Sequence, residues 1–109
     1  MAGHIPLKDD LVLTRGADFV ARYDIATSDP DIPTGTTATI EITETSDTDA
    51  VVVATWTADL VASRYVAFRV ESDLIDSIES GWRYRLLVSI PDTPTLEHCW
   101  YYGAIKRQQ

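Results

Sequence analysis

Residues 82–90 read WRYRLLVSI, an alternation of large apolar side chains with polar or basic ones. Successive side chains of a β-strand point to opposite faces, so this stretch predicts a strand with one apolar face. The predicted core face carries Trp82, Tyr84, Leu86, Val88 and Ile90. The other face carries two cations, Arg83 and Arg85, which form a basic stripe.

Similar patterns extend from this stretch toward both ends of the chain. Strands are predicted at residues 11–14, 18–25, 36–43, 50–58, 64–71 and 96–107, with the last one bent at Gly103. Three consecutive valines at residues 51–53 favour a strand that is covered on both faces. Seven strands separated by turn residues predict an all-β fold, an antiparallel β-sandwich with immunoglobulin-like topology.

One segment, residues 72–80, breaks the two-residue period. Leu74, Ile75 and Ile78 recur at helical spacing, Ser72 is a candidate N-cap, and Gly81 can end the segment in a left-handed conformation. We therefore predict one short helix or 3₁₀ segment that crosses between the two sheets. With 109 residues, the chain is expected to hold an N-terminal arm at residues 1–10 and a single sandwich domain at residues 11–109.

Net charge, apolar runs and cysteine content limit which partners and which cellular compartment are expected for this chain. Nine basic residues against 17 acidic ones give a net charge of −8, which argues against nucleic acid and against an anionic membrane surface. No apolar run approaches the roughly 20 residues that span a bilayer, and no signal peptide opens the chain. The single cysteine, Cys99, excludes an internal disulfide and fits synthesis in a reducing cytoplasm.

Catalytic and cofactor motifs are not found in the sequence. The two histidines are His4 and His98, and His98 adjoins Cys99 on a predicted strand, where neighbouring side chains point to opposite faces. We therefore expect no enzyme, no catalytic residues and no cofactor. The acidic residue pairs at 29 and 31 and at 47 and 49 are a weak signal for a calcium site, because aspartate is also the usual turn former and solvated turns are the favoured interpretation.

Two groups of side chains on the last strands are candidates for an interface. Alternation places Trp100 and Tyr102 on one face of their strand and Tyr101 on the other. These rings are expected to be core residues, anchors for a protein partner, or a platform that stacks on sugar rings. Arg83 and Arg85 either dock a partner or pair across strands with an acid, Glu71 or Glu97.

The N-terminal arm is a third candidate for the interface. His4, Ile5 and Leu7 make it too apolar for a free tail and too irregular for a strand, so we expect it to pack on a neighbour or on its own sandwich. Tyr84, close after a predicted corner, is either an ordinary core aromatic or a tyrosine corner whose hydroxyl ties down the preceding turn.

Four stretches carry a resemblance to a known family. They are LVLTRGADF at residues 11–19, PTGTTATIEI at 33–42, GWRYRL at 81–86 and WYYGAI at 100–105. The sequence from about residue 11 to 106 resembles the small β-sandwich domains of tailed-bacteriophage virion proteins. The LtfC-like, long-tail-fibre-type domains of actinobacterial phages and the N-terminal domain of baseplate upper proteins are similar.

The resemblance implies a non-enzymatic virion component. Such a protein is made in the host cytoplasm and packs in many copies against other virion proteins, as a minor tail, tail-fibre-associated or capsid decoration protein. Homo-oligomers are therefore expected in the assembled particle. A carbohydrate-binding module that recognises a glycan on the host surface is the alternative, and it requires Trp100 and Tyr102 to be exposed and coplanar.

Overall fold

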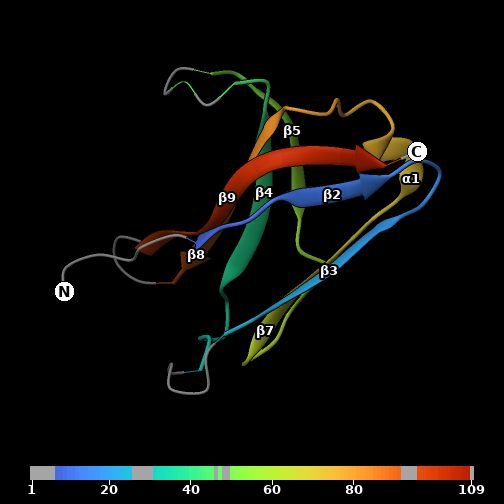
Figure 1. Ribbon diagram of the computed structural model, residues 1–109. Helices are drawn as coiled ribbons and strands as arrows, with labels where there is room; N and C mark the ends of the chain where they lie inside the picture. The colour runs from blue at the N-terminus through green and yellow to red at the C-terminus, as the bar shows by residue number, and fades with distance from the viewer. Residues whose placement is uncertain (1–6, 26–30, 46, 48–49, 92–95, 109) are drawn as a thin grey trace.

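The chain folds as a sandwich of two β-sheets (Figure 1). The computed structural model describes residues 7–25, 31–45, 47, 50–91 and 96–108. The large sheet has the order β1-β9-β8-β4-β5, with β2 also paired to β9, and the small sheet has the order β3-β7-β6. The large sheet holds β1 (Leu7–Lys8), β2 (Leu11–Thr14), β4 (Thr37–Thr43), β5 (Val52–Thr57), β8 (Arg83–Ile90) and β9 (Leu96–Gln108). The small sheet holds β3 (Phe19–Asp24), β6 (Leu60–Val61) and β7 (Tyr65–Val70).

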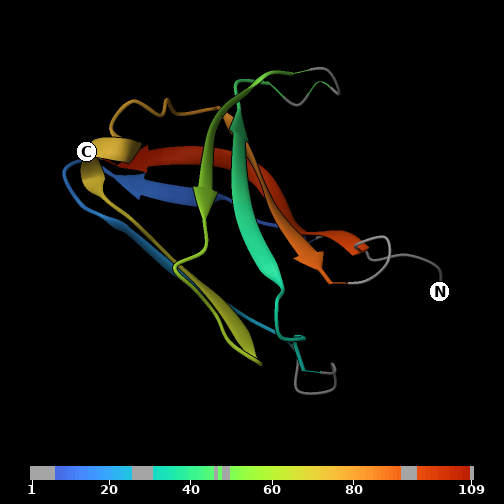
Figure 2. The ribbon, with the colours of Figure 1, turned by 180° about the vertical axis from the view of Figure 1, so that it is seen from behind.

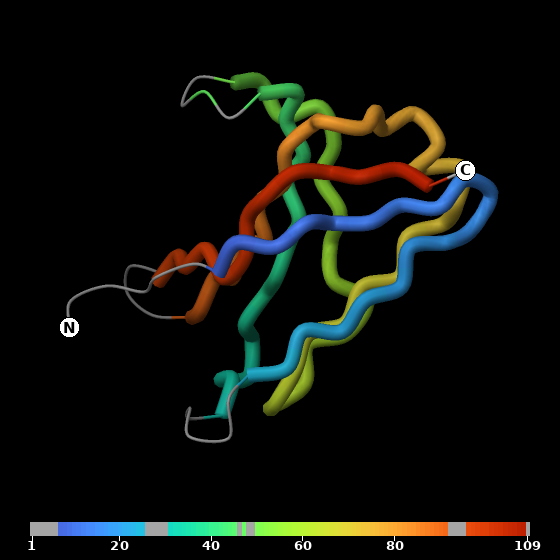
Figure 3. Tube along the Cα trace, viewed as in Figure 1, coloured from blue at the N-terminus to red at the C-terminus, as the bar shows by residue number. Residues whose placement is uncertain are grey.

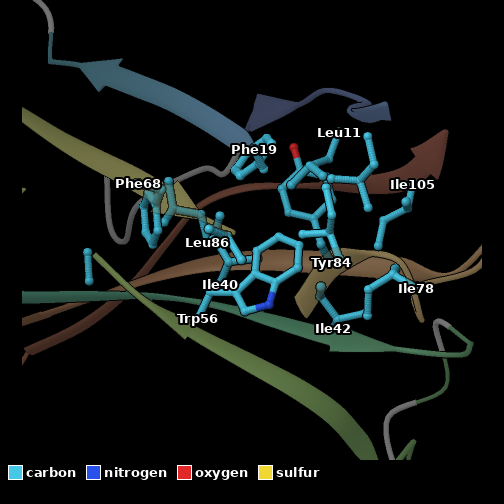
Figure 4. Close-up of a cluster of buried hydrophobic side chains, with 14 of the residues drawn as sticks. Leu11, Phe19, Ile40, Ile42, Trp56, Phe68, Ile78, Tyr84, Leu86 and Ile105 are labelled. Carbon is cyan, nitrogen blue, oxygen red and sulfur yellow. The ribbon is translucent and has the colours of Figure 1, made fainter. Parts of the chain in front are cut away.

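The core lies between the two sheets (Figure 4). The alternation of apolar and polar residues predicts which side chains point into it. Most of the predicted inward residues of β4, β7 and β8 are buried: Ala38, Ile40, Ile42, Val66, Phe68, Val70, Tyr84, Leu86 and Val88. Trp82 and Ile90, at the two ends of the predicted strand, are partly buried against this core. Trp56 reaches in from β5 and packs on Phe19, with ring centroids 5.6 Å apart. The predicted immunoglobulin-like β-sandwich is thus confirmed.

The N-terminal strands depart from an entirely antiparallel arrangement. β1 and β2 both run parallel to β9, with Leu7 opposite Tyr101 and Leu11 opposite Ile105 (Figure 3). The prediction that the arm is too irregular for a strand is therefore wrong for Leu7 and Lys8, which form β1. Sequence alternation reports which face a side chain occupies but not the direction of the neighbouring strand. The other two arm candidates, at positions 4 and 5, lie outside the described residues.

The three valines before and within β5 are not covered on both faces, so that prediction is wrong. Val51, Val52 and Val53 are 78%, 40% and 42% exposed. β5 is the last strand of the large sheet and pairs with β4 on one side, so nothing in the described residues continues the sheet beyond it. A register shift next to Ile42 further separates this part of β5 from the regular ladder.

The crossing between the sheets contains a shorter helix than predicted. α1 spans Ser72–Ile75 and lies beside the end of β9 (Figure 2). Ile75 and Ile78 are buried, and Gly81 takes the expected left-handed conformation with φ of 92°. Ser72 is not the N-cap, because Glu71 occupies that position without a side-chain cap.

Two side chains from distant parts of the chain hold this crossing in place. The Asp18 carboxylate accepts a hydrogen bond of 2.9 Å from the backbone N–H of Ser72. Arg107 on β9 donates to the carbonyls of Ile75 and Ile78 at 2.7 and 2.9 Å. The Arg107 guanidinium thus ties the end of the helix to β9, and the Ile75 carbonyl also accepts the backbone N–H of Ile78. None of the helices in the described ranges is long and apolar enough to cross a membrane.

Candidate functional site

A groove of about 570 Å³ opens on the outer face of the large sheet. Its lining comes from β1, β4, β8, β9 and the hairpin between β4 and β5. The charged side chains in the lining are Lys8, Asp47, Arg83 and Arg85, beside the ring of Tyr102 and the thiol of Cys99. Three of the sequence-predicted interface residues, Arg83, Arg85 and Tyr102, therefore meet in one groove.

Strand register brings these residues together. Arg85 lies opposite Tyr102 on β9 and opposite Glu41 on β4, while Arg83 lies opposite Thr43. Directly paired residues of neighbouring strands share a face of the sheet. The outward side of β8, read from the sequence as a basic stripe, is therefore the floor of the groove.

The two arginines differ in their ionic partners. The Arg85 guanidinium lies 3.2 Å from a carboxylate oxygen of Glu41. The expectation that the pair would involve Glu71 or Glu97 is wrong because β8 pairs with β4 along this stretch. Within the ranges that the structure describes, Lys8 and Arg83 form no salt bridge. The groove therefore holds two cations that are free to bind an anionic group.

The aromatic run on β9 does not form a flat pair of exposed rings. A register shift occurs where Leu86 pairs with Tyr101 and Leu87 pairs with Cys99, so Trp100 is an extra residue in the ladder. Both Trp100 and Tyr101 pack against the core, and Tyr102 is 40% exposed. The prediction that Trp100 and Tyr102 share a face is wrong, and the arrangement required for a sugar platform is not present.

His98 and Cys99 lie on opposite sides of the sheet, as predicted. His98 pairs with the buried Val88, whereas Cys99 pairs with Leu87 and lines the groove. The Cys99 thiol donates a weak hydrogen bond of 3.4 Å to the carbonyl of Tyr101. Burial raises the pKa of Cys99 and outweighs the nearby Arg85, which lowers it, so the thiol is protonated at neutral pH.

Tyr84 anchors the N-terminal strands beneath the groove. Its hydroxyl donates to the carbonyl of Asp9 at 2.8 Å, and the N–H of Asp9 donates to the carbonyl of Tyr102 at 3.0 Å. Burial is the main cause that raises the pKa of Tyr84 well above its usual value. The tyrosine-corner prediction is wrong, because the hydroxyl bonds to a residue at the other end of the chain.

Gly103 completes this contact, since a Cβ at that position would overlap the carbonyl oxygen of Asp9. The close approach lets the chain pass from β1 to β2 along β9. Lys8, which directly precedes Asp9, is thereby held at the groove. We refer to Asp9, Tyr84 and Gly103 as the strand clasp.

Sequence reasoning did not assign Lys8 to the interface and considered Asp47 only as a calcium ligand, because these residues come from a strand and a hairpin that are distant from β8 in sequence. Leu7 is 59% exposed on β1 but does not line the groove. Over the described ranges, no three His, Cys, Asp or Glu side chains are grouped as metal ligands. Positions 29 and 49, one member of each aspartate pair considered for calcium, are outside those ranges.

Comparison with known proteins gives one decisive match. The model of the family described as an LtfC-like, β-sandwich domain matches residues 6–108. The chain belongs to this family. The match covers almost the whole sequence and confirms the resemblance found from its turn and core residues.

Two solved structures align with this chain at low sequence identity. An uncharacterized protein from Bacillus anthracis str. Ames aligns with a TM-score of 0.46 and 12% identity, over 94% of this LtfC-like domain and 86% of that chain. The extracellular domain of the voltage-gated sodium channel β4 subunit aligns with a TM-score of 0.40 and 4% identity, over 100% and 99%. Neither likeness bears on function. No curated protein matches the sequence.

Proposed function

We propose that this chain is a non-enzymatic structural component of a tailed-phage virion that docks on neighbouring virion subunits through the groove. The roles considered are a minor tail, tail-fibre-associated or capsid decoration protein. Membership of the LtfC-like family supports the phage association. The observation that carries the docking role is the groove itself, where two cations without an ion pair in the described chain adjoin the partly exposed ring of Tyr102.

Charge explains why such a groove favours docking. The chain carries a net charge of −8, so a local group of Lys8, Arg83 and Arg85 contrasts with the molecule as a whole. Opposite charges steer and orient a partner more than they add affinity, and an adjacent aromatic ring supplies apolar contact. The placement of His98 and Cys99 on opposite faces supports the non-enzymatic part of the proposal.

Assembly of phage particles tests this function. The groove variant combines Lys8→Glu with Arg83→Glu, which leaves the Arg85–Glu41 pair intact. The control variant, Arg69→Glu with Lys106→Glu, makes the same charge change at two exposed cations outside the groove. We expect quantitative mass spectrometry to find the wild-type chain and the control variant in purified particles, and the groove variant strongly depleted.

Two results would contradict the proposal. One is that the wild-type chain is missing from purified particles. The other is that the groove variant is incorporated as well as the control. Thermal denaturation of each purified variant establishes beforehand that depletion does not reflect unfolding.

A further inference from the structure

We infer that the groove receives an acidic segment of a second copy of this chain, residues 71–79. This inference rests on the proposed function, because it names the partner that occupies the same groove. The segment reads ESDLIDSIE and contains four carboxylates and no basic residue. All four acidic side chains, at positions 71, 73, 76 and 79, are exposed.

Several acidic side chains outside this segment already have a partner within the same chain. The carboxylates of Asp24, Asp31 and Glu41 are already paired with arginines of the same chain. Asp18 accepts a backbone N–H and Glu97 accepts the Ser89 hydroxyl.

Most carboxylates within residues 71–79, by contrast, have no salt bridge among the described residues. Arg107 lies 3.7 Å from Asp76, but none of the salt bridges among the described residues involves Glu71, Asp73 or Glu79. Three carboxylates are therefore concentrated on a short stretch without a cation of their own.

The groove presents the opposite pattern. Of the nine cations in the chain, Arg22, Arg64, Arg85 and Arg107 are in salt bridges. Two of the remaining five, Lys8 and Arg83, line the groove, and the 57% exposed side chain of Arg85 lies beside them. Asp47 is the acid in the lining, so the cations outnumber the acids there by three to one. The groove and the segment are thus complementary in charge.

An apolar contact accompanies the charges. Leu74, in the middle of the segment, is 59% exposed on α1, and Tyr102 in the groove is 40% exposed. Docking the segment would bury both side chains, each of which is otherwise in contact with water. A central apolar contact ringed by charged pairs is the usual anatomy of a protein interface.

The positions of the two surfaces determine the kind of assembly. α1 lies beside the end of β9, apart from the hairpin of β4 and β5 that walls the groove (Figures 1 and 2). One copy can therefore offer its segment to a neighbour while its own groove is occupied. Such a head-to-tail contact uses two different surfaces, so repetition gives a closed ring or an open filament.

Sedimentation velocity of the purified chain tests the inference directly. At low salt and concentrations up to about 1 mM, we expect the wild type and the control variant to associate as concentration rises. Association should be lost near 1 M salt, where the screening length falls to about 3 Å. The groove variant should associate at least roughly tenfold more weakly, because attractive contacts become repulsive.

A charge-swap experiment separates specific docking from general electrostatics. The segment variant, Asp73→Lys with Glu79→Lys, should also fail to associate on its own. Mixing it with the groove variant pairs an acidic groove with a basic segment and a basic groove with an acidic segment. We expect association to return in the mixture. Failure of the mixture to associate would overturn the assigned contact.

Zero-length cross-linking identifies the residues in contact. A carbodiimide joins a lysine amine to a carboxylate, and the chain has two lysines, Lys8 and Lys106. In a mixture of isotope-labelled and unlabelled chains, we expect mixed-isotope cross-links from Lys8 to Glu71, Asp73 or Glu79. Cross-links from Lys106 alone would contradict the inference.

The inference and the proposed function can fail separately. A wild-type chain that stays monomeric at every salt and concentration overturns the self-docking inference. If the groove variant is nevertheless depleted from particles, the groove still binds another subunit and the proposed function stands. If the chain self-associates through the groove but is missing from particles, the proposed function is wrong.

Discussion

Replacement of Gly103 by alanine tests the strand clasp that holds β1 and β2 on β9. Among the glycines that the structure describes, Gly16, Gly35 and Gly81 have positive φ and Gly103 does not. Its backbone therefore accepts any residue, and the reason for glycine is space. A methyl group there would overlap the Asp9 carbonyl oxygen, so the N-terminal segment must move away from β9.

The expected loss follows from the contacts that this movement breaks. The Tyr84 hydroxyl loses its acceptor in a side chain whose residue is 2% exposed, and such an unpaired group costs about 1–3 kcal/mol. The bond from Asp9 N–H to Tyr102 contributes about 0.5–1.5 kcal/mol. Alanine regains about 0.5–1 kcal/mol of backbone entropy relative to glycine. The net loss is about 2 kcal/mol.

Urea denaturation followed by tryptophan fluorescence measures this loss, and a double-mutant cycle identifies its origin. Tyr84→Phe alone should destabilise the protein by about 1 kcal/mol. In the Gly103→Ala background the Asp9 carbonyl has already moved, so Tyr84→Phe should cost almost nothing. Hydrogen exchange should show faster exchange at residues 7–9 in Gly103→Ala.

Either of two results would refute this reasoning. The first is a loss below about 0.5 kcal/mol for Gly103→Ala, which would mean that the methyl group is accommodated. The second is strict additivity with Tyr84→Phe, which would mean that the clash does not act through Asp9.

Three further predictions concern the core, the crossing and alkaline stability. Phe68→Ala should reduce the free energy of unfolding by about 3–5 kcal/mol in urea denaturation, because the ring is fully buried between the sheets. Arg107→Met removes the nitrogen that donates to the carbonyls of Ile75 and Ile78; thermal denaturation should show a loss of about 1–2 kcal/mol, and an unchanged midpoint would contradict this role. Burial, helped by the charge of Asp9, raises the pKa of Tyr23 to about 12, whereas unfolded tyrosine ionises near 10. The contribution of protonated Tyr23 to the free energy of unfolding should therefore be fully present below pH 10 and be lost between pH 10 and 12. Denaturation followed by circular dichroism measures this loss of stability, which should be smaller in Tyr23→Phe.

The sequence was sufficient to predict the sandwich and most of its core. Alternating side chains at residues 36–43, 64–71 and 82–90 correctly separated inward from outward positions. This works because the side-chain period of a strand is a local property of the backbone. The same alternation correctly predicts that Arg83 and Arg85 lie on the outer face.

Only the tertiary structure decided which strands lie next to each other and in which register they pair. The exposure of Val51–Val53 depends on β5 being the last strand of its sheet, and the position of Trp100 depends on an extra residue in the β8–β9 ladder. Neither fact is local. Strand order and register arise from the simultaneous packing of the whole chain, because many pairings share the same alternation.

The groove and the strand clasp show the same division. The residues of the basic stripe could be read from one strand, but Lys8 and Asp47 reach the groove from segments that are far away in sequence. The sequence predicts only a bend at Gly103. In the structure, the absence of a side chain at Gly103 leaves space for the Asp9 carbonyl, which accepts the hydrogen bond of the Tyr84 hydroxyl. Local patterns specify faces of strands, whereas contacts between distant segments exist only once the two sheets have closed on each other.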